Sequence, residues 1–482
     1  MVPDIAENHW DVVRVRMPYM ITFNAPSISE MRTTMHFETI VEAGNKIRKG
    51  DITASALTEM MLDRIEEQNA NLNAYITVTV ELAREQARQA DSELRRGYDR
   101  GPLHGIPIAI KDLFATKHIR TTCGSKLFEN WIPNYDATVV TRLQEAGAVL
   151  LGKTGLHELA NGNTSINPYF GPVRNPVVND CDPGGSSGGS ASAVAAGLAF
   201  AALGTDTACS VRQPAHCCGI VGFKPTFGLV SKHGASQLAW TLDHVGPMAR
   251  NVQDCALMLD TIVGYDPDDF YSITSGSDET YQPTDISLEG LRLGVMRRYF
   301  FEGDADVVRV VDRALAALAN KGVVIVDLDI PDVERAFDAA MKTFAEAATV
   351  YGEALAAQPE KFSDELRKKI EWSARVSARE YMDAQAFRMD FTSRMESLLD
   401  TCDACVSPTS TRPALPIDNR PLDPEGFGIR NCVIFNFTGQ PSISIPCGTT
   451  AAGSPVGLML SGHKYEDRKV ITIANACENP HR

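Results

Sequence analysis

The order of hydrophobic and polar positions predicts a chain of alternating helices and strands. From about residue 50, apolar residues recur at helical spacing in TASALTEMMLDRIEEQNANL (53–72), which opens on a threonine cap, and in ELAREQARQADSELRRG (81–97), which ends on a glycine. The short apolar run AYITVTV (74–80) between them is typical of a strand. This part of the chain is therefore predicted as two amphipathic helices that flank one strand.

The same alternation continues towards the C-terminus. Helices are predicted over 139–148, over the small residues of 190–203 and over a long segment at about 332–358. Strands are predicted for a further set of apolar runs: IPIAIKDLF (106–114), AVLLGKT (148–154), LRLGVM (291–296), VVIVDLDI (323–330), ACVSP (404–408), SISIPC (442–447) and VGLMLSG (456–462). This pattern implies an α/β fold with a mostly parallel or mixed sheet that helices cover on both faces.

One large domain is the organisation that the pattern favours. Residues 1–35 show no steady period and are predicted to be an N-terminal arm, which leaves 36–482 as the domain. No internal repeat and no convincing linker divides this segment. The Pro- and Gly-rich residues 407–428 are predicted to form a long surface loop.

Composition and charge narrow the classes of partner. The chain has 482 residues, of which 44% are hydrophobic, so it can bury a large core. Its formal charge is -15 and it has no run of five or six Lys or Arg, so neither nucleic acid nor an anionic membrane surface is an expected partner. This charge balance favours small or neutral ligands. The absence of a signal-peptide pattern and of a membrane-span-length apolar window predicts a soluble protein, and the scattered cysteines predict a cytoplasmic one.

Eleven cysteines without regular spacing are expected to be reduced thiols rather than a disulfide framework. Cys402 and Cys405 form a C-x-x-C pair, but no second pair follows at zinc-site spacing. A structural role at the start of a strand is predicted for both, and no metal site is expected.

Two short motifs match known functional patterns, but the sequence around each does not fit the function. Gly147–Thr154 matches the phosphate-binding pattern G-x-x-x-x-G-K-[ST], but the intervening Ala-Val-Leu-Leu belongs inside a buried strand rather than in a loop around phosphates. Residues 185–189 match the nucleophile elbow G-x-S-x-G with Ser187 at its centre, yet a Pro-, Asn- and Asp-rich loop precedes them where a strand is required. The remaining candidate bases for such a serine stand in settings that do not mark them as catalytic: His216, His233, His244 and His463.

Lys111 stands out because it lies in the apolar segment IAIKDLF. A buried ammonium is costly, so burial lowers the pKa of a lysine and makes it a base; the alternative is an amine that reaches the surface from the strand end. Two serine-bearing, glycine-rich segments, 184–190 and 204–210, are candidates to meet this lysine. Lysine can activate serine without histidine.

These residues predict a proton relay. Lys111 would take a proton from Ser186, and Ser186 would take one from Ser210, whose oxygen then attacks a carbonyl group. Glycines around Ser186 permit close approach of the chain to a substrate. The backbone N–H groups of Thr207–Ser210 are expected to point at the developing oxyanion.

The sequence resembles the amidase signature hydrolases in motifs that occur in the family's order. Similarity runs from about residue 36 to near the C-terminus, and the motifs are GPLHGIPIAIKDLF, GAVLLGKTGLHELA, NPVVNDCDPGGSSGGSASAVAAG, ALGTDTACSVRQPA, CGIVGFKPTFGLVS and LDHVGPMAR. The resemblance implies a single α/β domain with a central mixed sheet. It also implies a catalytic set of a lysine, a serine held by a cis peptide and a nucleophilic serine, which correspond to Lys111, Ser186 and Ser210.

Further site residues follow from the same resemblance. The oxyanion hole would consist of the amides of Thr207, Ala208, Cys209 and Ser210, and Asp206 and Arg212 would pair as structural support. Ala208-Cys209 replaces the Gly-Gly that is usual in the family, which would cause strain if either position requires a positive φ. The substrate-binding region is expected to include Ala160, Asn161, Gly185 and Ser187, together with part of 335–435.

The implied reaction is hydrolysis of a C–N bond in an amide, anilide or carbamate through an acyl-enzyme, with no metal or organic cofactor. The family also includes the A subunit of glutamyl-tRNA amidotransferases, but segment 350–400 lacks that branch's tyrosine- and glycine-rich glutamine-binding stretch, which favours a stand-alone amidase. A non-catalytic binding protein of the same fold is a third hypothesis, motivated by Ala208-Cys209. The sequence leaves the oligomeric state open, and a homodimer is the assembly named for it because homodimers are the commonest oligomers.

Overall fold

A long mixed sheet organises the structure, a computed structural model that describes residues 39–274, 280–418, 426 and 428–478. Residues 1–35, predicted to be an arm, lie outside the described residues. Within the described residues the sheet has eleven strands, in the order β1 (Tyr75–Val78), β3 (Val149–Thr154), β2 (Pro107–Lys111), β6 (Ala201–Asp206), β8 (His244–Ala249), β7 (Val221–Lys224), β12 (Ser442–Thr449), β13 (Pro455–Ser461), β11 (Ala404–Pro408), β9 (Arg292–Val295) and β10 (Val324–Asp327).

The strand directions confirm the predicted mixed α/β sheet. Strands β3, β2 and β6 run parallel to one another, as do β11, β9 and β10, and the remaining neighbours pair antiparallel. The central strands β2 and β6 are fully buried, which explains their continuous apolar sequences. A separate two-stranded sheet pairs β4 (Ile166–Asn167) with β5 (Gly171–Pro172).

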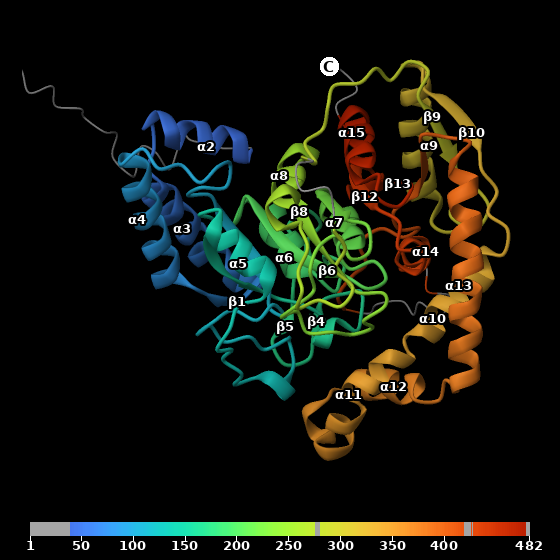
Figure 1. The fold of residues 1–482 in the computed structure, drawn as a ribbon, viewed down its shortest axis with the longest axis horizontal. Helices are drawn as coiled ribbons and strands as arrows, with labels where there is room; N and C mark the ends of the chain where they lie inside the picture. Colours follow the sequence, from blue (N-terminus) through green and yellow to red (C-terminus); the bar gives the residue numbers. More distant parts are fainter. Residues whose placement is uncertain (1–38, 275–279, 419–425, 427, 479–482) are drawn as a thin grey trace, which may run out of the picture. The chain divides into compact units, whose positions relative to one another are not determined.

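Helices flank both faces of this sheet (Figure 1). In Figure 1 the first helices, drawn in blue, lie at the β1 end, and α13 lies near the other end. The helices are α2 (Ile40–Lys49), α3 (Ala54–Leu72), α4 (Val80–Arg95), α5 (Thr138–Glu145), α6 (Gly188–Ala195), α7 (Arg212–Cys218), α8 (Val252–Ile262), α9 (Ala305–Ala319), α10 (Val333–Thr343), α11 (Ala345–Ala357), α12 (Asp364–Ser373), α13 (Ala378–Leu399), α14 (Arg430–Thr438) and α15 (Asp467–Glu478).

The predicted helix over 190–203 is wrong in its second half. Helix α6 ends at Ala195, and Gly197 follows with a φ of 67°, a left-handed conformation that glycine adopts without strain. The apolar residues 201–203 then open strand β6. A small-residue run that is buried on every side has no period by which a helix can be told from a strand.

Three further segments differ from the prediction. The long helix at 332–358 is two helices, α10 and α11, separated at Phe344. The predicted surface loop at 407–428 is wrong at its start, because 407–411 are buried; residues 419–425 and 427 lie outside the described residues. Helix α14 was not predicted, since all of its residues are buried and its sequence has no amphipathic period.

None of the described helices is both long and apolar enough to cross a membrane.

Candidate active site

The site lies at the carboxyl ends of two adjacent parallel strands. Ile110 of β2 pairs with Leu203 of β6, so Lys111 at the end of β2 and Thr205 near the end of β6 reach the same edge of the sheet. This edge is where ligands bind in open α/β sheets. The chain then turns through 207–210 into α7, and the loop before α6 brings Ser186 to the same place.

Lys111 is fully buried beneath this edge. Its Nζ lies 2.7 Å from Ser186 Oγ and donates a hydrogen bond to Thr205 Oγ1 at 2.8 Å. Burial lowers the pKa of Lys111 to about 7, against the opposing charges of Asp206 and Asp243. The alternative of a lysine that reaches the surface is wrong, and a large fraction of this amine is neutral at neutral pH.

The Ser186 loop is packed tightly against its surroundings. The Gly185–Ser186 peptide is cis, and a Cβ at Gly185 would lie 2.6 Å from the backbone nitrogen of Thr164. Gly185 N donates to Gln213 Oε1 at 2.9 Å, which joins the loop to α7. Glycine is required at position 185 because the neighbouring backbone leaves no room for a side chain.

Ser210 lies beside the same loop and is 5% exposed. Its carbonyl oxygen accepts a hydrogen bond from Ser187 N at 3.2 Å. Within the described part of the chain, no hydrogen bond joins the hydroxyls of Ser186 and Ser210. Hydrogen bonds between catalytic groups are often long before a substrate is bound. The structure thus pairs Lys111 with Ser186 directly and brings Ser210 next to that pair.

The turn formed by Thr207 to Ser210 contains no residue with a left-handed backbone conformation. Neither Ala208 nor Cys209 has a positive φ, so the strain that could have followed from replacing Gly-Gly is absent. Thr207 Oγ1 donates to Asp243 Oδ1 at 2.6 Å, which anchors the start of the turn. Burial raises the pKa of the Cys209 thiol well above its usual value, and Sγ lies 3.6 Å from Gly185 O. A buried, protonated thiol is a poor nucleophile.

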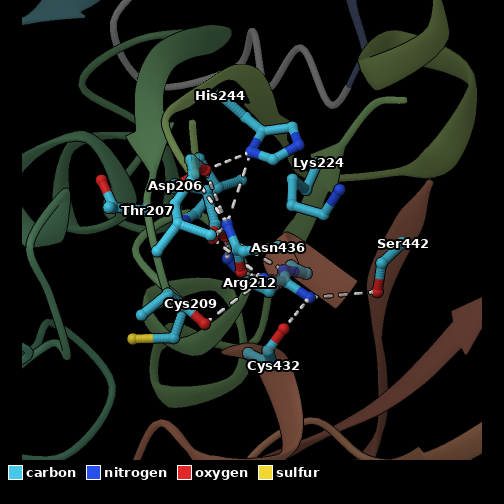
Figure 2. Close-up of polar contacts among 12 residues, drawn as sticks. Asp206, Thr207, Cys209, Arg212, Lys224, His244, Cys432, Asn436 and Ser442 are labelled. Atoms are coloured by element: carbon cyan, nitrogen blue, oxygen red, sulfur yellow. Dashed lines mark hydrogen bonds and ion pairs between the residues drawn. The ribbon is translucent and has the colours of Figure 1, made fainter. Parts of the chain in front are cut away.

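Figure 2 shows a buried ion pair behind the turn. Arg212 donates to both carboxylate oxygens of Asp206, at 3.0 and 2.9 Å, and both side chains are fully buried. Arg212 Nη2 also donates to Asn436 Oδ1 of α14 at 2.6 Å. Burial alone would raise the pKa of Asp206, but the charge and hydrogen bonds of Arg212 and those of Asn436 hold it below its usual value. The structure therefore pairs the two side chains with each other, and their supporting role stays a prediction.

A cavity of about 450 Å³ opens at the turn. The four turn residues line it, and so do Ala160 and Asn161, which were predicted for the substrate region. Gly185 and Ser187 are not among its described lining residues; Ser187 Oγ instead donates to Thr205 O at 3.2 Å, behind the turn. The remaining lining includes apolar side chains from several segments: Leu238, Met341, Phe344, Trp372 and Ile429.

Several residues of the site were missed by the sequence analysis. Thr205 binds Lys111, Gln213 binds the Ser186 loop, Asp243 binds Thr207, and Asn436 binds both Arg212 and Asp206. Thr205 and Asn436 are polar residues within buried apolar segments, which is a usable signal because buried polar groups need partners. Gln213 and Asp243 lie within the quoted motifs ALGTDTACSVRQPA and LDHVGPMAR, but nothing in their local sequence distinguishes them from ordinary polar residues.

The rejected motifs are structural. Lys153 of the P-loop-like segment is buried in β3, donates to Phe114 O at 2.9 Å and pairs with Asp112 at 3.2 Å, so it is unavailable to a phosphate. No histidine lines the described cavity, and His216 binds the backbone of Arg412 and Gly457. Between residues 39 and 478, as far as they are described, no group of three or more His, Cys, Asp or Glu residues is arranged to hold a metal ion.

Known sequences are similar to this chain over most of its length. The profile of the family described as Amidase matches residues 56–471. The glutamyl-tRNA(Gln) amidotransferase A subunit of Halorhodospira halophila (strain DSM 244 / SL1) is 39% identical over 469 residues, which cover 92% of this chain and 96% of the relative. Its counterpart from Geobacter sp. (strain M21) is 37% identical over 472 residues, 91% of this chain and 96% of the relative.

Solved structures show the same architecture. The native peptide amidase from Stenotrophomonas maltophilia superposes with a TM-score of 0.81 at 30% identity, covering 92% of this chain and 96% of that one. A bacterial aryl acylamidase of the amidase signature family superposes with a TM-score of 0.84 at 25% identity, covering 92% and 96%. Both similarities extend over nearly the whole chain.

Proposed function

The chain belongs to the amidase signature family, and from that premise we propose that it is a serine hydrolase that cleaves the C–N bond of small amides. One observation carries the proposal: the buried Lys111 amine lies 2.7 Å from Ser186 Oγ, next to a cavity that Ser210 lines. A lysine with a pKa of about 7 in contact with a serine hydroxyl is suited to act as a general base.

The proposed first half-reaction forms an acyl-enzyme. Neutral Lys111 accepts the Ser186 proton while Ser186 accepts the Ser210 proton, and Ser210 Oγ bonds to the amide carbon. The amides of Thr207 to Ser210 stabilise the negative oxygen that forms. The C–N bond then breaks, and the leaving amine takes a proton from Ser186, which is reprotonated by Lys111. Water activated by the same relay cleaves the ester.

The proposed substrate is a small amide with an apolar body. A cavity of about 450 Å³ lies within the range of small-molecule sites, and much of its described lining is apolar. Anilides and other aryl amides fit this lining, and the solved aryl acylamidase supports them as a starting class. Aryl carbamates present the same carbonyl chemistry and belong in the same assay.

The test is a release assay over anilides, primary amides and aryl carbamates. Wild-type protein is expected to release amine from at least one class, and Ser210→Ala to lose about 10³-fold or more in kcat. Lys111→Ala and Ser186→Ala are expected to lose about 10²- to 10⁴-fold, the usual contribution of proton transfer. Near-normal rates in folded Lys111→Ala or Ser186→Ala protein would contradict the relay.

A second candidate is the A subunit of an amidotransferase, favoured by relatives that are 36–39% identical over more than 90% of the chain. The two functions differ in what the isolated chain does. A stand-alone amidase hydrolyses anilides or primary amides without other proteins. Glutaminase activity that appears only with added partner subunits, without hydrolysis by the isolated chain, would select the second candidate. The hypothesis of a non-catalytic protein was based on strain from Ala208-Cys209, and it has no support in the backbone, because neither residue has a positive φ.

A further inference from the structure

The charges on the cavity wall are unbalanced. Among its described lining residues are two lysines, Lys368 and Lys369 of α12, and no carboxylate. The charge of Lys369 is matched, because its Nζ lies 2.6 Å from Glu365 Oε1 and also donates to Asn161 O at 2.7 Å. Lys368 is exposed and forms no ion pair with any residue that the structure describes. Among the described lining residues, Lys368 is therefore the cation without an ion pair, in a protein whose formal charge is -15.

Helix α12 holds this charge in a defined place. At its start, Ser363 Oγ accepts a hydrogen bond from Leu366 N at 3.3 Å, which caps the helix. Ser363 N lies 3.4 Å from Glu158 Oε2, and Lys369 binds Asn161, so contacts at the start and in the middle of α12 join it to the 158–161 segment. That segment also lines the cavity, so Lys368 is carried on a helix that is fixed to the site.

The rest of the wall indicates which molecule would use this charge. Besides Lys368, the lining supplies the apolar surfaces of Trp372, Met341 and Phe344 and the side-chain amide of Asn163. A ligand with an apolar framework would pack against these side chains, and an anionic group on that ligand would be attracted to the unpaired ammonium of Lys368. The described lining contains no carboxylate, which would repel such an anion.

We infer that Lys368 selects amide substrates that carry a carboxylate in addition to the amide. The inference rests on the proposed hydrolysis and names its substrate class. An ion pair at an exposed site changes affinity by about two- to fivefold, and added salt weakens it. The selectivity therefore belongs to binding, and it is expected in KM more than in kcat.

The experiment compares two matched pairs of substrates. Glutaryl-4-nitroanilide and pentanoyl-4-nitroanilide differ by a carboxylate on the acyl side; 4-acetamidobenzoate and 4-methylacetanilide differ by one on the amine side. For each pair the ratio of kcat/KM, charged over neutral, is measured for wild-type protein and for Lys368→Ala, Lys368→Arg and Lys321→Ala. Lys321 is an exposed lysine outside the described cavity lining, so it controls for the loss of one surface charge.

Wild-type protein is expected to prefer the carboxylate in at least one pair, and Lys368→Ala is expected to lower that ratio about two- to fivefold. Lys368→Arg and Lys321→Ala are expected to keep the wild-type ratio. Salt at 0.5 M is expected to reduce the ratio in the proteins that have Lys or Arg at position 368, and to leave it unchanged in Lys368→Ala. A wild-type ratio below one in both pairs, or a ratio that Lys368→Ala leaves unchanged, overturns the inference while leaving the proposed hydrolysis intact. Failure to cleave all four anilides by protein that hydrolyses a primary amide or an aryl carbamate overturns this inference alone. Failure to cleave any of the three classes contradicts the proposed function, and with it this inference.

Discussion

At the scale of single residues, the chemistry of the site depends on how completely Lys111 is buried. A solvated lysine is protonated at neutral pH and cannot accept a proton, whereas the buried Lys111 has a pKa of about 7. Its two contacts within hydrogen-bond distance are the hydroxyls of Ser186 and Thr205, which can either donate or accept. The surroundings of Lys111 therefore tolerate both of its protonation states.

The pH dependence of hydrolysis follows from this pKa. Because burial lowers the pKa, the amine is neutral and competent as a base above about pH 7, and it becomes protonated as the pH falls. We expect kcat/KM for a neutral anilide to rise about tenfold per unit below pH 7 and to level off above it. A profile measured from pH 5 to 10 checks this.

A plateau that extends unchanged down to pH 5 would contradict a lysine base, and a rise centred near pH 10 would contradict its burial. Lys111→Arg is the matched control, since arginine keeps its charge throughout this range. It should show low activity without the rise at pH 7.

At the scale of structural elements, the turn before α7 owes its shape to α14. Asn436 of α14 donates to the backbone and side chain of Asp206, at 2.8 and 2.9 Å, and accepts from Arg212. The same helix accepts from Arg212 through Cys432 O at 3.0 Å. The proposed oxyanion hole is therefore supported by a segment more than 200 residues away in sequence.

Loss of Arg212 should destabilise the fold strongly. Arg212→Met leaves the buried Asp206 carboxylate without its cation, and breaking a buried pair in this way costs about 3–5 kcal/mol of unfolding free energy. Equilibrium unfolding in urea measures the change. The matched control is Arg297→Met, which removes an exposed ion pair to Asp312 with the same 2.9 Å separation and should cost less than about 1 kcal/mol. Equal effects in the two variants would contradict the supporting role of the buried pair.

At the scale of the whole molecule, the sequence predicted the local elements better than their arrangement. Apolar runs located β3 and β11 well, because a buried strand is a short apolar run bounded by turn residues, whereas the run predicted at 106–114 extends beyond the end of β2 at Lys111. The position of β8 between β6 and β7, and of β12 beside β7, depends on pairing between distant segments, which no local period records. Helix α14 escaped detection for a related reason, since a helix buried on all sides has no polar face.

In the candidate site too, some residues could be predicted from the sequence and others only from the fold. Lys111, Ser186 and Ser210 could be proposed because a lysine in an apolar strand and serines among glycines are unusual in themselves, and the family's motifs then joined them. The residues that support them, such as Gln213 and Asp243, are ordinary polar residues whose partners are defined only by the fold. Lys368 is likewise one lysine among many until α12 places it at the cavity.

The central claim is that Ser210 is the nucleophile, and covalent labelling with a fluorophosphonate tests it most directly. Peptide mapping by mass spectrometry is expected to find the label on Ser210 in wild-type protein and in Cys209→Ala. Ser210→Ala should remain unlabelled although folded. Labelling on Ser186 or Ser187, or no labelling of folded wild-type protein, would contradict the account.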